Sequence, residues 1–235
     1  MNRVLIAAVA ATTLFAGPVM AQSAKFAASW DDDPVVVEAY ATDEAAMICN
    51  DGTLTNGYCI EAELEMAQLH VGSKKSILVG VSSEIGIHLI TRAKGKGGVS
   101  GAESATAKAE GAVEVVLSLV DVDDSAKTCD IAPSDRVTLK SEMRELTVSA
   151  TATEGDIEVE VAIDTDSIGA HHFEFLGVEC EQGTYRLTAT FNLSALASAS
   201  GYDADSTATV TLMDRMITMQ EVRAVKGSLV EDPIN

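Results

Sequence analysis

Aromatic residues are scarce in this chain of 235 residues, at 4 % of the total, and only one of them is a tryptophan. A β-barrel that spans a membrane carries girdles of aromatic residues at both lipid interfaces, so their scarcity argues against that class. Proline is also rare, with four residues, and no Pro-, Ser- or Gly-rich linker divides the chain. Beyond the N-terminal stretch, no apolar run is long enough for a membrane-spanning helix.

The N-terminal stretch has the three parts of a secretory signal peptide. Arg3 supplies the positive charge, Val4–Phe15 is apolar apart from two threonines, and Val19–Ala21 forms a site of small residues before Gln22. This pattern predicts a signal peptide over residues 1–21, and export to the periplasm, the cell surface or the medium.

Acidic residues outnumber basic residues in this chain. The chain has 16 Lys and Arg against 36 Asp and Glu, and loss of Arg3 with the signal peptide would leave 15 against 36, a net charge of −21. Nucleic acids and anionic membrane surfaces would repel such a protein, so we expect neither as a partner.

Four cysteines are present, at Cys49, Cys59, Cys129 and Cys180. In an exported protein an even number of cysteines predicts disulfides, and their spacing matches no zinc motif. Of the three possible pairings we favour Cys49–Cys59, which would close a local loop rich in turn residues, together with Cys129–Cys180, which would join distant segments.

Helical periodicity is absent, and a period of two takes its place. From Ala105 to Leu119 every second residue is apolar or small (Ala105, Ala107, Ala109, Gly111, Val113, Val115, Leu117 and Leu119), with mostly polar residues between them. This pattern predicts a strand with one buried face. The run exceeds an ordinary strand, so we expect a bend or bulge at Gly111.

Alternation recurs in other segments. It predicts strands over 77–89, 137–152, 157–163 and 185–193 and in the region 207–225, with Phe173 and Phe175 on a further strand. Breaks in the alternation predict a change of strand direction or a bulge at Ser83, and bulges near Arg144-Glu145 and Asp214. Two other segments are expected to differ: a mobile basic loop over 92–101 and a short helical turn within 194–200.

Together these one-sided strands predict an all-β fold. We expect an antiparallel β-sandwich, immunoglobulin-like or jelly-roll-like, with long bulged strands and little helix. One domain would span residues 22–235; the alternative is two smaller sandwiches divided near Asp121–Asp135.

The stretch Gln182–Thr190, QGTYRLTAT, resembles the G-T-Y-x-L-T-x-T strand of bacterial immunoglobulin-like and PKD-like sandwiches. In those families the glycine opens a turn and the tyrosine packs at a sheet corner, which the resemblance implies for Gly183 and Tyr185. The segments Gly72–Gly86 and Glu221–Ser228 resemble a group of exported bacterial proteins. That resemblance implies no activity and no functional residues.

No catalytic motif is complete. Gly80-Val81-Ser82-Ser83-Glu84 lacks the final glycine of a nucleophile elbow, and there is no H-E-x-x-H. His171 and His172 are adjacent, so on a strand they would point to opposite faces and could not bind one metal ion together. We therefore expect a protein that is not an enzyme.

Calcium is the small ligand that the sequence favours. Acidic segments occur at Asp121-Val122-Asp123-Asp124, at Asp164-Thr165-Asp166-Ser167 and at Asp203-Ala204-Asp205-Ser206. Alternating carboxylates in a loop supply the oxygen ligands that Ca²⁺ prefers. The candidate ligands are Asp121, Asp123, Asp124, Asp164 and Asp166; no other cofactor is expected.

The sequence thus favours an exported structural, matrix or adhesion protein of the cell surface. Exposed sheet edges could pair with a neighbouring copy and form a homo-oligomer or fibre. The alternative is a secreted module that binds calcium or carbohydrate, with aromatic platforms at Trp30, Tyr40, Tyr58 and Tyr202.

Overall fold

The computed structural model describes residues 26–42, 46–48, 60–65, 68–73, 75–98, 101–127, 129–152 and 155–222. The signal-peptide prediction lies outside these residues. The described residues form strands and no helix: β1 (Phe26–Asp31), β2 (Val35–Thr42), β3 (Ala46–Ile48), β4 (Ile60–Glu65), β5 (Leu69–Val71), β6 (Lys75–Gly98), β7 (Gly101–Asp121), β8 (Asp130–Ala132), β9 (Val137–Ser149), β10 (Ile157–Cys180), β11 (Gly183–Gly201) and β12 (Ala204–Val222). The described residues contain no helix that is long and apolar enough to cross a membrane.

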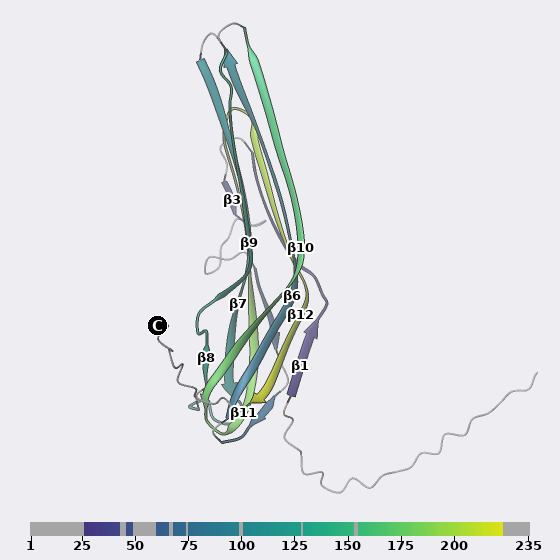
Figure 1. Ribbon diagram of the computed structural model, residues 1–235, viewed down its shortest axis with the longest axis vertical. Coiled ribbons are helices and arrows are strands. Elements are labelled where there is room, and N and C mark those ends of the chain that lie inside the picture. Colours follow the sequence, from purple (N-terminus) through teal and green to yellow (C-terminus); the bar gives the residue numbers. More distant parts are fainter. Residues whose placement is uncertain are drawn as a thin grey trace, which may run out of the picture.

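All strand pairings are antiparallel, and the sheet folds over into two layers. In the first layer β6 lies between β10 and β12, with β8 beside β10 and with β1 and β2 in succession along β12. In the second layer β7 lies between β9 and β11, with β3, β4 and β5 along β11. A short pairing of β6 with β7 joins the layers, which gives a long, nearly closed, barrel-like arrangement (Figure 1).

Three pairs of consecutive long strands, β6–β7, β9–β10 and β11–β12, each place one strand in each layer. The chain therefore changes layer three times at one end of the molecule, which we call the tip. At the tip, Lys94 donates a backbone hydrogen bond to Asp203 and Tyr202 donates one to Ser104. The β11–β12 connection thus contacts both β6 and β7.

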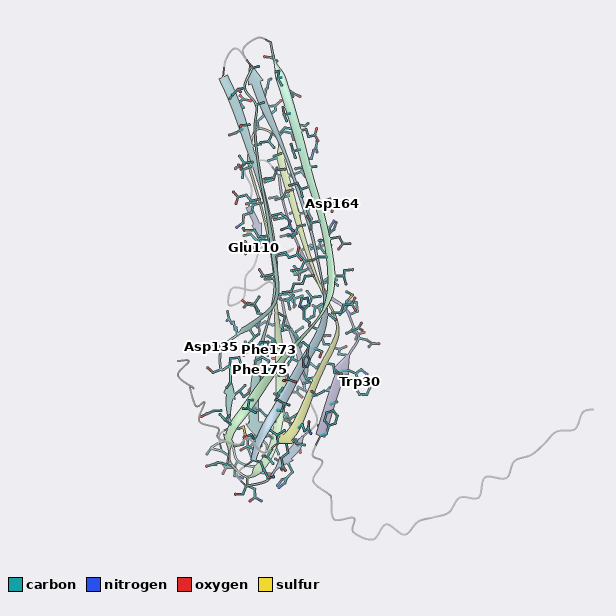
Figure 2. The ribbon with its side chains drawn as sticks, viewed as in Figure 1. Trp30, Glu110, Asp135, Asp164, Phe173 and Phe175 are labelled. Atoms are coloured by element: carbon teal, nitrogen blue, oxygen red, sulfur yellow. A yellow bond between two sulfur atoms is a disulfide. The ribbon has the colours of Figure 1, made fainter. Side chains whose placement is uncertain are left out.

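The core explains the slender shape. Towards the tip its inward-facing residues are alanines, from β2, β6, β7, β11 and β12 (Ala39, Ala41, Ala93, Ala105, Ala107, Ala109, Ala195, Ala197, Ala199, Ala204 and Ala208). Towards the opposite end of the molecule, which we call the base, the inward-facing residues are larger (Ile77, Val79, Phe175, Tyr185, Leu187 and Phe191). Figure 2 shows Phe173 and Phe175 in this lower half. Small side chains let the two layers approach closely near the tip.

The predicted alternation of β7 is confirmed, because the odd positions from Ala105 to Val115 are buried. A bulge at Gly111, one of the two predicted features, is wrong: β7 pairs with β11 without a break, and its register shift against β9 falls between Val113 and Glu114. Gly111 instead provides space. A Cβ there would lie 2.6 Å from Val210 Cγ2 and 3.0 Å from Ile87 Cγ2, across the core in β12 and β6.

Other local predictions need correction. Residues 92–98 of the predicted loop are not a loop, because β6 continues as a strand to Gly98 and pairs with β10; residues 99 and 100 lie outside the described residues. Residues 194–200 belong to β11 and form no helical turn, and Phe173 and Phe175 lie on the same strand as 157–163. The β9 bulge lies at Leu139 rather than at Arg144-Glu145, since Val113 faces Lys140 and Glu114 faces Thr138.

The break near Ser83 has its cause in the neighbouring strand. Ser83 is buried and β6 pairs with β10 continuously there, whereas the register of β12 shifts between Met213 and Met216. The bulge predicted near Asp214 is therefore confirmed, and Asp214 has a positive φ of 45°. One bulge in β12 accounts for both sequence signals.

Candidate functional site

The upper part of β10 forms an open edge of the first layer. One side of β10 pairs with β6 along the whole strand, and on the other side the only strand pairing in the described residues is with β8, at residues 176–178. Four apolar side chains alternate along the open part and remain 37–44 % exposed: Ile157, Val159, Val161 and Ile163. We call these four residues the β10 row. The sequence predicts the strand correctly but places the row in the core, which is wrong.

The reason for this exposure lies in the opposite layer. A Cβ at Gly95 or Gly97 of β6 would approach the backbone of Ser149 and Ala150 to within 2.8 and 2.7 Å, so the end of the second layer packs directly on β6. Val159 of β10 lies opposite Gly95 of β6, so the row is one strand farther from the second layer than the contact at Gly95. β10 therefore extends beyond the second layer, and the side chains of the row are only partly covered.

Below the row, charged side chains from β9 close the gap between the layers. Lys140 Nζ donates hydrogen bonds to the carbonyl of Ile85 at 3.2 Å and to that of Ser167 at 2.9 Å, and the Ser167 hydroxyl bonds to the Glu142 carboxylate. Arg144 Nε reaches the Thr165 hydroxyl at 3.4 Å. Inward-pointing charges of this kind protect a strand edge from pairing with another chain. The sequence gives no sign of this cluster, because the misplaced β9 bulge assigns Lys140 and Glu142 to the outer face.

The outer face of the tip carries a network of ion pairs. Arg92 contacts Glu160 and Asp205, and Lys94 contacts Asp203 at 2.7 Å and Glu160 at 3.8 Å. The hydrogen bond that Arg92 donates to Glu160 raises the pKa of Arg92, and the bond from Lys94 lowers the pKa of Asp203. The two cations compensate part of the negative charge of Glu160, Asp203 and Asp205 on the outer side of the row.

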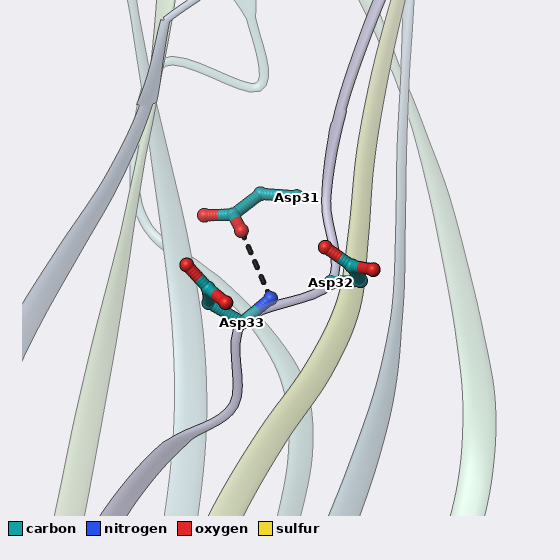
Figure 3. Close-up of side chains that lie close together, drawn as sticks. All are labelled: Asp31, Asp32 and Asp33. Carbon is teal, nitrogen blue, oxygen red and sulfur yellow. Dashed lines mark hydrogen bonds between the residues drawn. The ribbon is translucent and has the colours of Figure 1, made fainter.

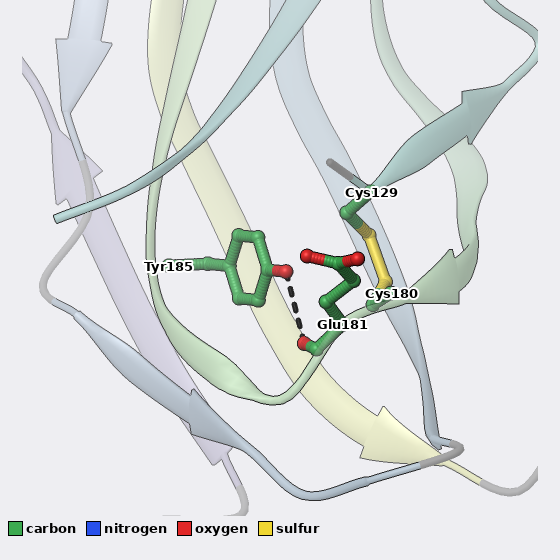
Figure 4. Close-up of a disulfide and its surroundings, with 4 residues drawn as sticks. All are labelled: Cys129, Cys180, Glu181 and Tyr185. Atoms are coloured by element: carbon green, nitrogen blue, oxygen red, sulfur yellow. Dashed lines mark hydrogen bonds between the residues drawn. A yellow bond between two sulfur atoms is a disulfide. The ribbon is translucent and has the colours of Figure 1, made fainter. Parts of the chain in front are cut away.

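The base of the molecule is held by a disulfide and a tyrosine (Figure 4). The predicted Cys129–Cys180 bond is present, while Cys49 and Cys59 lie outside the described residues. Tyr185 is fully buried, and its hydroxyl donates to the carbonyl of Glu181, four residues earlier, at 2.9 Å. A hydrogen bond of this kind at the start of a strand has the geometry of a tyrosine corner.

The candidate calcium ligands fall into separate places. Asp121 is buried at the end of β7, and its Oδ1 accepts hydrogen bonds from the backbone N–H groups of Asp123, at 2.9 Å, and Asp124, at 2.8 Å. Burial raises the pKa of Asp121, but these backbone bonds and the nearby ammonium of Lys127 outweigh it, so the net shift is downward. Asp121 thus organises a turn whose Asp123 and Asp124 side chains face solvent.

Asp164 and Asp166 do not lie in a loop, which corrects the sequence prediction. Both occupy the outer face of β10, within the strand, and Asp164 contacts His88 Nε2 at 2.7 Å. Figure 2 shows Asp164 along the upper part of β10. Asp121 lies at the base, where it pairs with Tyr185. The structure does not bring the five predicted calcium ligands together.

A different acidic group is compact: one carboxylate oxygen from each of Asp31, Asp32 and Asp33 lies within 4.8 Å of the others (Figure 3). Asp31 Oδ1 accepts the backbone N–H of Asp33 at 3.0 Å, and its other oxygen binds the buried guanidinium of Arg215. Arg215 also donates to the carbonyl of Asp33 at 3.0 Å. The guanidinium of Arg215 compensates the charge of Asp31, while the Asp32 and Asp33 side chains are exposed to solvent.

One Ser–His–carboxylate arrangement occurs on the outer face of β6 and β10. The Ser82 hydroxyl lies 2.7 Å from His172 Nδ1, and His172 Nε2 lies 3.7 Å from Glu174. The His172 and Glu174 side chains are more than half exposed, so water surrounds the pair and weakens its electrostatics. The contact between Ser82 and His172 follows directly from their position opposite each other in the ladder.

The aromatic residues that the sequence suggests as carbohydrate platforms lie in different parts of the molecule. Trp30 and Tyr40 are strongly exposed on β1 and β2. Tyr202, at the tip, donates its hydroxyl to Glu158 at 3.1 Å and lies under Lys96 Nζ, 5.7 Å from the ring centroid. Tyr58 lies outside the described residues.

Comparisons with known proteins give no family. No family model matches the chain, and no curated protein matches it. Among solved structures, a chain from the crystal structure of the T13 IBDV viral particle aligns over 81 % of this chain and 41 % of its own length, with 12 % identity and a TM-score of 0.11. This chain therefore spans less than half of that protein, and a TM-score so low carries no structural argument.

Proposed function

We propose that this chain is an exported structural or interaction protein, not an enzyme, that associates with copies of itself through the open edge of β10. The observation that carries the proposal is the β10 row on an edge without a strand partner. Unpaired backbone groups and alternating Ile and Val side chains are the features through which strands add to a sheet. A contrast along β10 supports this. Lys140, Glu142 and Arg144 of β9 cover its lower part, whereas no charged side chain of the described residues is recorded in contact with the inward-facing side chains of the row.

The row is also complementary to itself. Two copies of β10 aligned antiparallel would place Ile and Val side chains on one shared face, in a two-fold arrangement. On the opposite face, Glu160 is paired with Arg92 and Lys94, which limits repulsion between two acidic copies at this position.

For the fold we propose an antiparallel β-sandwich of jelly-roll-like or immunoglobulin-like type. The two layers with their shared core and the Tyr185 corner support this class. Export is supported by the signal-peptide pattern and by the Cys129–Cys180 disulfide, since disulfides persist in oxidising compartments.

The test is the state of assembly of the purified mature chain, residues 22–235. Light scattering after size exclusion and electron microscopy should show dimers or larger assemblies whose proportion rises with protein concentration. The double variant Val159→Lys/Val161→Lys places two ammonium groups on the row and should give monomers.

Val120→Lys is the matched control, because Val120 is similarly exposed but lies on β7, away from the row. This variant should assemble like the wild type. A wild-type chain that stays monomeric at millimolar concentration, or assemblies that survive both lysines in the row, would refute the proposal.

A further inference from the structure

The most exposed aromatic side chains in the described structure share one face of one sheet edge. Trp30 is 75 % exposed, Phe26 57 % and Tyr40 56 %, and all three lie on β1 or β2. The register with β12 places them on the same side: Phe26 is opposite Gln220, Trp30 opposite Met216 and Tyr40 opposite Thr207. Figure 2 shows Trp30 projecting away from the body of the molecule.

Polar groups that can bond to hydroxyls run beside these rings. On β12, the outward residues next to β1 and β2 are Thr207, Thr209, Thr211, Thr218 and Gln220. Hydroxyl and amide groups both donate and accept hydrogen bonds. Aromatic rings beside a line of such groups form a surface that suits sugar rings, which present C–H groups on their faces and hydroxyls at their edges.

The negative charge of this surface determines which kind of sugar it can bind. Asp32, Asp33 and Glu38 are exposed between Trp30 and Tyr40. The only basic residue of β1, β2 and β12 is Arg215, which is buried and bound to Asp31. Positive groups on the next strand are already paired: Lys94 contacts Asp203, and Arg92 contacts Glu160. The surface is therefore complementary to a cationic ligand.

We propose that this surface, formed by Phe26, Trp30, Glu38 and Tyr40 with the β12 threonines, binds a polysaccharide that carries free amino groups. Protonated amines bind the exposed carboxylates and the face of the Trp30 ring, which attracts cations, while the threonine hydroxyls bond to the sugar hydroxyls. A cationic peptide would satisfy the charges alone and would gain little from separate rings and a hydroxyl row. The site is separate from the β10 row, at the opposite edge of the first layer.

The experiment uses the fluorescence of Trp30, which is the only tryptophan of the chain. The mature protein is titrated with a soluble β-1,4-linked glucosamine oligomer, with its fully N-acetylated form and with polylysine of similar length. We expect a blue shift of the emission with the glucosamine oligomer, and binding at least about tenfold weaker with the acetylated form. Polylysine should give no comparable blue shift.

Two variants and a control define the surface. Tyr40→Ala and Glu38→Gln should each weaken binding of the glucosamine oligomer about fivefold to tenfold. Met143→Ala, which removes an equally exposed apolar side chain on β9, should leave binding unchanged. Circular dichroism and the midpoint of thermal unfolding would establish that each variant is folded.

The result of the sugar-binding experiment does not depend on the result of the assembly test. The monomeric Val159→Lys/Val161→Lys variant should bind the oligomer as the wild type does. Absence of a blue shift, equal affinity for the acetylated oligomer, an equal response to polylysine, or unchanged affinity of both surface variants would each overturn the proposal.

Discussion

Gly183 and Asp121 are so close that only a hydrogen atom fits between them: a Cβ on Gly183 would lie 1.7 Å from Asp121 Oδ2. Gly183 begins β11, directly after the turn that follows β10, and Asp121 ends β7 beside it. The resemblance of QGTYRLTAT to immunoglobulin-like strands implies a glycine that opens a turn. The structure adds a second requirement, which is contact with a buried carboxylate.

We predict that Gly183→Ala destabilises the protein by about 3 kcal/mol, because the new methyl group must displace the Asp121 carboxylate from its backbone donors. Chemical denaturation measures the change. Gly169→Ala on β10 is the control, since a Cβ there would meet only His171 Nε2, at an ordinary 3.5 Å, and its effect should be below about 1 kcal/mol. Equal effects of the two substitutions would contradict the assigned contact.

The lowered pKa of Asp121 predicts how stability depends on pH. A carboxyl group with a folded-state pKa below its ordinary value of 3.8 stabilises the fold above pH 3.8, and this contribution is lost as the pH falls through the folded-state pKa. Asp121→Asn keeps the Oδ1 acceptor for the backbone N–H groups of Asp123 and Asp124 but removes the charge. We expect the variant to be less stable than the wild type at pH 7.

The measurement is the free energy of unfolding of both proteins from pH 7 to pH 3. The gap between them should shrink once the pH falls below 3.8. Asp123→Asn is the comparison, since the Asp123 side chain is exposed, and it should show a smaller gap at pH 7. A constant gap between the Asp121 variant and the wild type at every pH would contradict the prediction.

Gly111 should behave as a packing residue and not as a hinge. Gly111→Ala is expected to cost about 2 kcal/mol, because its Cβ would meet Val210 Cγ2 at 2.6 Å inside a filled core. The second substitution Val210→Ala removes that atom. The double variant should therefore be more stable than the sum of the two single effects predicts, as a double-mutant cycle measures directly. Strictly additive effects would show that the destabilisation by Gly111→Ala does not come from contact with Val210.

The disulfide at the base should contribute substantially to the stability of the protein. Cys129 and Cys180 are 51 residues apart, so the bond restricts a long segment of the unfolded chain. Replacing both by alanine should lower the free energy of unfolding by about 3 kcal/mol while the circular-dichroism spectrum stays that of a β-protein. A loss below about 0.5 kcal/mol would show that the other contacts of β8 and β10 hold the base unaided.

Local patterns were reliable where one face of a strand meets the core. The odd positions of 105–115 and of 185–193 are buried as alternation predicts, because a strand turns successive side chains to opposite faces whatever its partners are. The bulge near Asp214 was predictable for the same reason, since one extra residue reverses the phase of everything after it.

Patterns failed where a partner strand decides the outcome. Gly95 and Gly97 suggested a mobile loop, yet they lie within β6, where the backbone of Ser149 and Ala150 approaches too closely for a side chain. Val159 and Val161 have the alternation of core residues, but β10 extends beyond the opposite layer. Asp164 and Asp166 suggested a cation loop but occupy a strand whose outer face already supplies His88 as a partner.

The amino-acid sequence alone determined that this chain forms long one-sided strands around an aliphatic core, because burial of alternate side chains depends only on the geometry of the extended backbone. It also determined that alanine and glycine gather in the segments that form the slender tip. Only the tertiary structure decided which edges stay open and which residues are exposed together. The β10 row is exposed because the second layer ends short of it, and Phe26, Trp30 and Tyr40 share a face because β1 and β2 pair in succession with one strand, β12. Both are relations between strands far apart in the chain, and no local pattern encodes them.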